Sequence, residues 1–441
     1  TLSATVAASY VGSALRRLFL PAAARDAHRT ATHRRNAERI LAVGGRLKGG
    51  IMKALQLLSY QSEVLPDEYL DILSGLQDQA PPMSAAEASA QIEADLGAPP
   101  ARLFATFDPE PTAAASLGQV HRATLRGGRP VAVKVQYPGI AAEVAADLKL
   151  LRRSLVAQKV AGSDLLRQRG LDHRHLYADI AARLTEELDY RREALHLRVF
   201  GALYAGRPDV RVPAVVANRS GAHVLTMDWI DGYPIRDVMN EGADYALRER
   251  TVRTLNWMST HEVLGVGITH ADPHPGNYLV TADGVALLDL GCVKVIDDAR
   301  LPHYRNQVRA LLTGDRDLLV ASLEGIGQLA PGQDPAPAIA FTEFLYLPVL
   351  EDKPWDGRTL DFPAELSKRL AALVRARHFQ FPADTVFLMR KFIGLAAVFR
   401  AMRVHTINFR REYVDYLAED LPAAEAVRRR VLADYPALTT A

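Results

Sequence analysis

The segment Asp272-Pro273-His274-Pro275-Gly276-Asn277 places a carboxylate and an amide five positions apart. Two prolines restrict the backbone of this segment, so the two polar groups are expected to hold fixed positions. The carboxylate of Asp272 can orient or deprotonate a hydroxyl, and the side-chain oxygen of Asn277 can ligate a hard cation. Twelve residues after Asn277, an apolar run ends at a second acid, Asp289, and Gly291 permits a sharp turn behind it. A carboxylate there can hold Mg²⁺ against nucleotide phosphates.

Either pattern alone is common by chance, but together they have the spacing of the catalytic and metal-binding loops of kinases. Upstream, Val131-Ala132-Val133-Lys134 places a lysine on an apolar strand. A single lysine there most often extends to solvent. In a kinase it contacts the α- and β-phosphates and pairs with a glutamate on a helix. The helix expected at 173–202 offers four acidic candidates, which are Glu186, Glu187, Asp189 and Glu193.

Residues 112–119, Thr-Ala-Ala-Ala-Ser-Leu-Gly-Gln, occupy the position at which a kinase carries its glycine-rich phosphate loop. Alanines replace most of the glycines. The backbone N–H groups could still surround a phosphate, but the methyl groups restrict close approach and mobility of the loop. The composition of this segment is therefore not typical of a signalling kinase.

Helical spacing of apolar residues predicts helices at 32–61 and 66–79, and Ser84 with Glu87 forms a capping-box pattern that opens a third helix ending near Leu96. A β-hairpin follows, with strands at 119–125 and 131–135 and a turn at 126–129. Further predicted elements are helices at 140–160 and 173–202, strands near 211–217 and 223–227, and short apolar runs at 278–280 and 285–288 in a mostly helical remainder. A small sheet with helices, followed by a helical half, indicates an α+β fold with two lobes.

The 441 residues exceed what one compact core usually holds. A net charge of +2 argues against a dedicated nucleic-acid-binding protein. Cys292 is the only cysteine, which excludes a disulfide framework within the chain and favours a reducing compartment such as the cytoplasm. No uninterrupted apolar run approaches the ~18–20 residues of a membrane-spanning helix. We therefore expect a cytoplasmic protein, with peripheral contact at the inner membrane as an alternative.

Several motifs in the same order resemble those of the UbiB/AarF (ADCK) atypical kinase family, over roughly residues 35–410. The alanine-rich segment 113–121 looks like the phosphate loop of this family, and 131–139 looks like its lysine strand with the trailing Gln-Tyr-Pro-Gly. Residues 187–190 (Glu-Leu-Asp-Tyr) are similar to its ExD element. The segments 224–232 and 269–277 resemble its hinge and its catalytic loop.

The resemblance implies a kinase-like fold that binds ATP and Mg²⁺. Its parts would be a helical N-terminal extension (1–100) packed over the nucleotide site, an N-lobe (101–232) and a helical C-lobe (233–441). Asp272 would be the catalytic acid, Lys134 would pair with Glu193, and Asn277 and Asp289 would hold the metal. The expected nucleotide contacts are Ala113, Ala114, Ala115, Ser116, Gly118, Gln119 and Lys134 for the phosphates, and Met227, Asp228, Trp229 and Ile230 for adenine.

The family also carries an N-terminal KxGQ motif that covers the site. Its counterpart here is Lys53-Ala54-Leu55-Gln56, in which Leu55 replaces the glycine. The resemblance implies that Lys53 pairs with Glu187. The leucine leaves open how closely this segment packs over the site.

These features favour Mg²⁺-dependent ATP binding, with slow hydrolysis or phosphotransfer to a small or lipid-like molecule. By resemblance, the role would be support of ubiquinone or other isoprenoid-lipid metabolism at a membrane surface, with a lipid or isoprenoid ligand. The basic run 428–430 would suit an anionic lipid. The alternatives are a conventional protein serine/threonine kinase, against which the alanine-rich loop argues, and an ATP-gated scaffold without turnover.

Overall fold

The structure is a computed structural model that describes residues 83–356 and 382–438, except Ser116, residues 161–172 and Glu241, together with scattered single positions elsewhere. Apart from Thr32 and Arg35, the helices predicted at 32–61 and 66–79 lie outside the described residues, as does the motif of Lys53. The chain divides into two compact units. The first comprises residues 1–192 and 215–229, and the second comprises residues 193–214 and 230–441.

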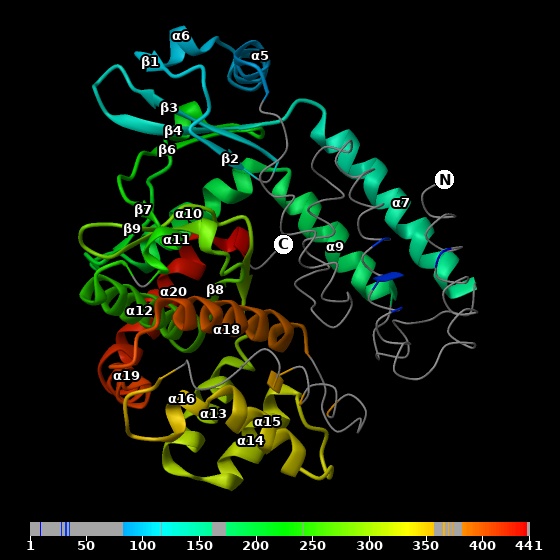
Figure 1. Cartoon of the computed structure of the whole chain (residues 1–441), viewed down its shortest axis with the longest axis vertical. Coiled ribbons are helices and arrows are strands. Elements are labelled where there is room, and N and C mark those ends of the chain that lie inside the picture. The colour runs from blue at the N-terminus through cyan, green and yellow to red at the C-terminus, as the bar shows by residue number, and fades with distance from the viewer. Residues whose placement is uncertain are drawn as a thin grey trace. The chain divides into compact units, whose positions relative to one another are not determined.

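The first unit contains a five-stranded antiparallel sheet in the order β1-β3-β4-β6, with β2 paired to β3 (Figure 1). Its strands are β1 (Thr106–Phe107), β2 (Ala113–Ala115), β3 (Gly118–Thr124), β4 (Pro130–Gln136) and β6 (Val224–Asp228). The predicted hairpin is confirmed as β3 and β4. In its register Val120 lies opposite Lys134, and Lys134 lies opposite Leu225 on the other side. Lys134 is thus on a central strand.

Helices α5 (Ala85–Leu96) and α6 (Pro100–Leu103) cover one face of this sheet. Both hydrogen bonds of the predicted capping box between Ser84 and Glu87 are present. The shared core joins Ala88, Ile92 and Leu103 of the helices, and Phe104 directly after α6, to Val131, Val133 and Val135 of β4. Because side chains alternate along a strand, Lys134 points to the opposite face.

The helix predicted at 173–202 is two helices, α9 (His173–Glu187) and α10 (Tyr190–Leu203), and α7 (Ile140–Val160) precedes them. The interruption has a local cause. The carboxylate of Asp189 accepts a hydrogen bond from the backbone N–H of Arg191 at 3.0 Å, as a helix-capping residue does. The N–H of Tyr190 donates to the oxygen of Ala222 at 2.9 Å, outside the helix.

The strand predicted near 211–217 is wrong over most of its length. Only Val210–Arg211 forms a strand, β5, and it belongs to the second unit. Val215 makes one isolated bridge to Met227, and Ala217–Arg219 is a 3₁₀ turn. Pro213 in this stretch cannot donate to a sheet ladder, which is consistent with the short pairing.

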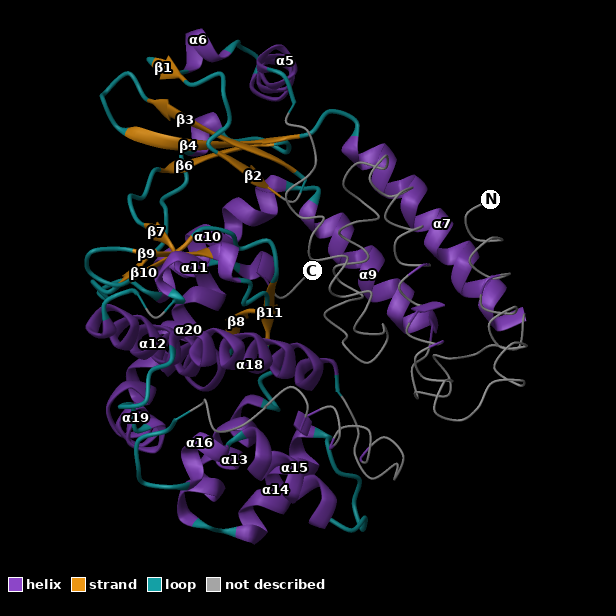
Figure 2. Ribbon diagram, in the orientation of Figure 1, coloured by secondary structure: helices purple, strands orange, loops and turns teal. Residues whose placement is uncertain are grey.

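The second unit is mostly helical, with two small sheets (Figure 2). One sheet has the order β5-β10-β9-β7, with β7 (Tyr233–Pro234), β9 (Tyr278–Val280) and β10 (Val285–Leu287), and the other pairs β8 (Ile268–His270) with β11 (Val293–Val295). The predicted runs at 278–280 and 285–288 are therefore strands. In addition to most of α10, the described helices of this unit are α11 (Ile235–Val238), α12 (Tyr245–Thr260), α13 (Leu301–Thr313), α14 (Arg316–Ile326), α15 (Ala336–Leu345), α16 (Leu347–Leu350), α18 (Ala383–Met402), α19 (Phe409–Asp415) and α20 (Leu421–Asp434).

A π-helical turn, His261–Val266, continues α12 and ends at Gly267, whose φ of 60° lets the chain reverse into β8. Arg428 of α20 stabilises the reversal of the chain at Gly267. It is 7% exposed, donates to the backbone oxygens of Val266 and Ile296, and pairs with Asp298. The expectation that Arg428 binds lipid is therefore wrong, because its guanidinium serves the interior of the fold.

In the part of the chain that the structure describes, no helix combines the length and the apolar character needed to cross a bilayer.

Candidate active site

The loop after β8 carries the first group of predicted site residues. Asn277 ends the 3₁₀ turn Pro275–Asn277, and its side-chain nitrogen donates to the backbone oxygen of Asp272 at 3.0 Å. The same nitrogen lies 3.4 Å from Oδ2 of Asp272. The oxygen of the amide is consequently turned away from Asp272, as a metal ligand requires. His274 accepts a hydrogen bond from the N–H of Gly276 at 3.0 Å, which stabilises the loop.

The second predicted metal ligand follows β10. Oδ1 of Asp289 accepts the N–H of Gly291 at 2.9 Å, and the N–H of Leu288 donates to the backbone oxygen of Asn277 at 2.9 Å. The structure thus brings Asp272, Asn277 and Asp289 together at one end of the β9–β10 hairpin.

The oxygen donors of Asn277 and Asp289 fit Mg²⁺, which usually takes one or two protein ligands plus substrate phosphates. Among the residues that the structure describes, no group of three or more His, Cys, Asp and Glu side chains could hold a metal by itself. Two oxygen donors are the number that a magnesium ion takes from a protein when nucleotide phosphates supply further ligands.

Glu262 lies beneath the loop and was not identified from the sequence. It is 2% exposed and accepts hydrogen bonds from the hydroxyl of Thr269 at 3.0 Å and the N–H of His270 at 2.8 Å. The hydroxyl of Tyr204 donates to its other oxygen at 2.5 Å, and Lys391 forms a buried ion pair with it. Glu262 therefore fixes the strand that leads into the predicted catalytic loop.

The surroundings set the ionisation of this buried cluster. Burial alone would raise the pKa of Glu262, but the charge of Lys391 and the hydrogen bonds from Lys391 and Tyr204 hold the pKa below its usual value. Burial lowers the pKa of His270, so the imidazole is neutral at pH 7. Neither ring nitrogen of His270 finds a hydrogen-bond partner among the described residues, and the side chain is 1% exposed. The side chain of His270 is therefore part of the packing around this loop and not of its exposed surface.

A second missed residue, Arg390 on α18, contacts the predicted catalytic acid directly. Its Nη2 donates to Oδ1 of Asp272 at 2.8 Å, and the two side chains are 13% and 20% exposed. Sequence reasoning had no signal for this pair, because 118 residues separate its members.

The phosphate-binding residues predicted in the first unit lie on its sheet. Ala113, Ala114 and Ala115 form β2, opposite Val120, Gln119 and Gly118 of β3, so the alanine-rich segment is one arm of a tight hairpin. Ser116 is not described. A Cβ added to Gly118 would lie 2.2 Å from the backbone oxygen of Val135, so only glycine allows this strand spacing.

Two polar residues of this sheet have buried partners. Lys134 is 7% exposed, and its Nζ lies 5.0 Å from the centre of the Tyr190 ring. The side chain of Gln119 bonds both backbone groups of Met83, at 3.0 and 3.3 Å, and also His121 at 2.8 Å. The amide of Gln119 is therefore engaged inside the unit, and its backbone lies between β2 and β4 in the sheet.

The predicted hinge begins with the edge strand β6 and continues beyond it. The carboxylate of Asp228 accepts from Nε of Arg129 at 2.5 Å, and the N–H of Trp229 donates to the oxygen of Pro130 at 3.2 Å. Met227 is buried, and Ile230 begins the second unit. With the side chain of Asp228 engaged, contact with adenine through the hinge would fall to backbone groups.

The acidic partners predicted for the two lysines lie on α9 and α10. Glu193 is 5% exposed in the first turn of α10, and Glu187 is the last residue of α9. Glu193 belongs to the second unit and Lys134 to the first, and Lys53 is not described. The pairs Lys134–Glu193 and Lys53–Glu187 remain predictions.

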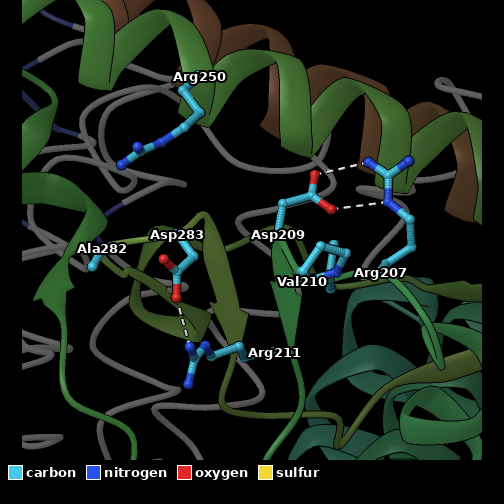
Figure 3. A pocket seen from close by; sticks show the side chains of 8 residues that line it. Arg207, Asp209, Val210, Arg211, Arg250, Ala282 and Asp283 are labelled. Atoms are coloured by element: carbon cyan, nitrogen blue, oxygen red, sulfur yellow. Dashed lines mark hydrogen bonds and ion pairs between the residues drawn. The ribbon is translucent and has the colours of Figure 1, made fainter.

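A hollow of about 690 Å³ on the second unit contains none of the predicted site residues (Figure 3). Most of the charges that line it neutralise one another. Arg207 makes two hydrogen bonds to Asp209, at 2.9 and 2.7 Å, and Arg211 pairs with Asp283 at 2.6 Å. The hollow therefore does not compete with the loop of Asp272 as the candidate site.

The small antiparallel sheet, the helical second unit and the two acid-bearing loops define a kinase-like protein. A model of the ABC1 atypical kinase-like domain matches residues 75–323, and the chain belongs to this family of atypical kinases.

Curated relatives agree with this assignment. A Synechocystis protein without an assigned function is 33% identical over 353 residues, which cover 79% of this chain and 58% of that protein. A chloroplastic aarF domain-containing protein kinase of Arabidopsis thaliana is 42% identical over 285 residues, 64% of this chain and 39% of that protein. The Arabidopsis protein ACTIVITY OF BC1 COMPLEX KINASE 3 is 35% identical over 307 residues, 67% and 41% of the two chains. The chain thus spans roughly two fifths to three fifths of the length of these relatives.

Among solved structures, the complex of Rv3197 with erythromycin from Mycobacterium tuberculosis matches with a TM-score of 0.63 and 28% identity. The match covers 89% of this chain and 97% of that chain.

Proposed function

We propose that the chain binds Mg²⁺-ATP and acts on its γ-phosphoryl group as an atypical kinase or ATPase. One observation carries the proposal: Asn277 is hydrogen-bonded to Asp272 through its side chain and to Leu288, the neighbour of Asp289, through its backbone. A candidate base and two candidate metal ligands therefore have fixed relative positions, which phosphoryl transfer requires.

In this proposal Asp272 receives the proton of an attacking hydroxyl, from an acceptor or from water. The hydroxyl oxygen bonds to the γ-phosphorus, the bond from that phosphorus to the β–γ bridging oxygen breaks, and ADP leaves. Asn277 and Asp289 would hold Mg²⁺, which neutralises phosphate charge when it is bound. Lys134, paired with Glu193, would contact the α- and β-phosphates.

The composition of the phosphate loop bears on the class of acceptor in this proposal. Three consecutive alanines on β2 limit the mobility of the loop and the approach of the backbone to the phosphates. This supports slow hydrolysis, or transfer to a small or lipid-like molecule, over a conventional protein serine/threonine kinase. Support of ubiquinone or other isoprenoid-lipid metabolism, with a lipid or isoprenoid ligand at a membrane surface, rests on the family resemblance.

The test compares Mg²⁺-ATP binding and ATPase turnover for the wild type, Asp272→Asn and Asp289→Asn, with and without anionic liposomes. We expect Asp272→Asn to retain nucleotide and lose turnover, and Asp289→Asn to weaken Mg²⁺-dependent binding. Asp283→Asn is the matched control, because Asp283 is exposed on the turn of the same hairpin.

Unchanged turnover in both variants, with ATP still bound, would favour the ATP-gated scaffold. Efficient transfer to a generic protein substrate would favour the conventional kinase instead.

A further inference from the structure

Helix α18 contacts the candidate catalytic loop at three points within the second unit. Arg390 bonds Asp272, and Lys391 pairs with Glu262 and lies 3.3 Å from the backbone oxygen of His270. One turn later, a Cβ on Gly394 would lie 2.3 Å from Cγ of Pro273. These contacts place the helix directly against the loop, although it lies outside residues 75–323, which match the family domain.

The loop that carries Asp272 contains no permanently charged cation. Residues 268–277 read Ile-Thr-His-Ala-Asp-Pro-His-Pro-Gly-Asn, with neither lysine nor arginine, and burial keeps the pKa of His270 low. Arg390, from α18, places a positive charge beside Asp272. A guanidinium is planar and always charged, so it orients a carboxylate more strictly than an ammonium does.

The two oxygens of Asp272 have different neighbours. Oδ1 accepts from Arg390 at 2.8 Å, whereas Oδ2 lies 3.4 Å from the side-chain nitrogen of Asn277. Arg390 thus fixes the rotation of the carboxylate and leaves Oδ2 on the side of the proposed metal ligand. A base that receives a proton in phosphoryl transfer must be held in this way, because small errors in position cost large factors in rate.

We propose that Arg390 is a positioning residue for Asp272, and that α18 is therefore part of the active site. This inference rests on the proposed function. Arg390 acts on the proton acceptor and not on the nucleotide, so its loss lowers kcat and leaves the affinity for Mg²⁺-ATP unchanged.

Arg390 can be separated experimentally from the structural residues of the same helix. Lys391 is 3% exposed and is the counter-ion of Glu262, so its loss disturbs the interior, whereas Arg390 is 13% exposed. Arg400, exposed near the end of α18, provides a matched arginine control.

The test measures ATPase kcat, Mg²⁺-ATP affinity and thermal unfolding for the wild type, Arg390→Ala, Arg390→Lys, Arg400→Gln and Asp272→Asn. We expect Arg390→Ala to lower kcat by about tenfold or more with nucleotide affinity within about twofold. Arg390→Lys recovers part of the loss, and low millimolar guanidinium restores turnover in Arg390→Ala. Guanidinium does not restore Asp272→Asn, and adding Arg390→Ala to Asp272→Asn causes little further loss.

The inference is overturned if the wild type is active and both Arg390 variants keep its kcat, or if the losses of Asp272→Asn and Arg390→Ala multiply in the double variant. A wild type that neither binds nor turns over Mg²⁺-ATP overturns the proposed function, and this inference with it. If Arg390→Ala does not fold, Arg390→Lys and its double variant with Asp272→Asn decide the question.

Discussion

The backbone N–H of Leu288 donates to the backbone oxygen of Asn277 at 2.9 Å. This bond continues the register of β9 and β10, in which Leu287 lies opposite Tyr278. The candidate metal ligands Asn277 and Asp289 are therefore positioned by one antiparallel hairpin and not by two independent loops. Because the strands of this hairpin are largely buried, the hairpin can hold Asn277 and Asp289 near each other without bound metal.

Removing one of these donors tests the metal site. Asn277→Ala deletes the amide oxygen and also the bond to Asp272, so we expect the Mg²⁺ concentration for half-maximal ATP binding to rise about tenfold or more. A magnesium titration with a fluorescent nucleotide measures this directly. Asp283→Asn in the turn of the same hairpin should titrate as the wild type does, and an unchanged titration for Asn277→Ala would remove Asn277 from the site.

The buried pair of Glu262 and Lys391 should be strongly coupled. Lys391→Met leaves the carboxylate of Glu262 buried without its cation, which we expect to cost about 3–5 kcal/mol in the free energy of unfolding. The double variant with Glu262→Gln should recover much of that loss. Urea unfolding of the two single variants and the double variant measures the coupling, and additive losses would contradict it.

The close approach of α18 to the catalytic loop depends on Gly394. In Gly394→Ala the new methyl group meets the ring of Pro273, so we expect a destabilisation of about 1–3 kcal/mol and reduced turnover. Gly201→Ala on α10 is the matched control, since a Cβ there meets nothing within 4 Å. Better helix propensity should make Gly201→Ala neutral or up to about 1 kcal/mol more stable. Equal effects of the two substitutions would show that contact with Pro273 is unimportant.

The stability of the second unit should fall in mild acid. Burial lowers the pKa of His261 from 6.5 to about 4, although the charges of Glu262 and Asp420 oppose this. The ring stacks on Trp257 with centroids 4.6 Å apart, and Nδ1 lies 2.9 Å from the hydroxyl of Tyr416. Between pH 6.5 and about 4 the unfolded chain binds a proton that the folded chain does not, so stability decreases as the pH falls through this window.

Urea unfolding at pH 7.5 and 5.5 isolates this contribution. We expect His261→Gln to lose about 1 kcal/mol less than the wild type between the two pH values. The comparison between the two proteins is necessary because the pKa of His270 and that of His121 are also lowered by burial. Parallel losses in the two proteins would show that His261 does not contribute.

In the first unit, Asp95 on α5 holds the turn that precedes the hinge strand. Its carboxylate accepts the N–H groups of Ala222, His223 and Val224 at 3.3, 2.9 and 2.9 Å. Asp95→Ala should therefore cost about 1–3 kcal/mol, because these donors lose their acceptor. Chemical denaturation measures the loss, with Glu93→Ala, at an exposed position of the same helix, as the control. Equal stability of the two variants would contradict the role of Asp95.

Local patterns in the sequence predicted the local elements. The alternation over β3 and β4 and the capping box of Ser84 operate over a few residues, and both are present. The break at Asp189 between α9 and α10 was missed because the helical spacing of apolar residues continues across it. An aspartate is, however, a common N-cap residue, so the break could have been predicted. The strand expected near 211–217 was misplaced because its pairing partners lie far away in the chain.

The candidate site also contains residues that local patterns identified and residues that they did not. Asp272, Asn277 and Asp289 lie within 18 consecutive positions and were identified by their spacing. Glu262, Arg390 and Lys391 were not, because only the packing of α18 against the loop brings them together, over separations of 118 and 129 residues. The sequence contains no periodicity that could indicate such pairs.

The separation of Glu262 from Lys391 also has a consequence for synthesis on the ribosome. Glu262 emerges 129 residues before its cation. At about 5–20 residues per second this interval lasts roughly 6–25 s. Until Lys391 emerges, burying Glu262 would leave a charge without a counter-ion, or require it to take up a proton. The catalytic loop is therefore expected to reach its native arrangement late, after α18 has left the exit tunnel.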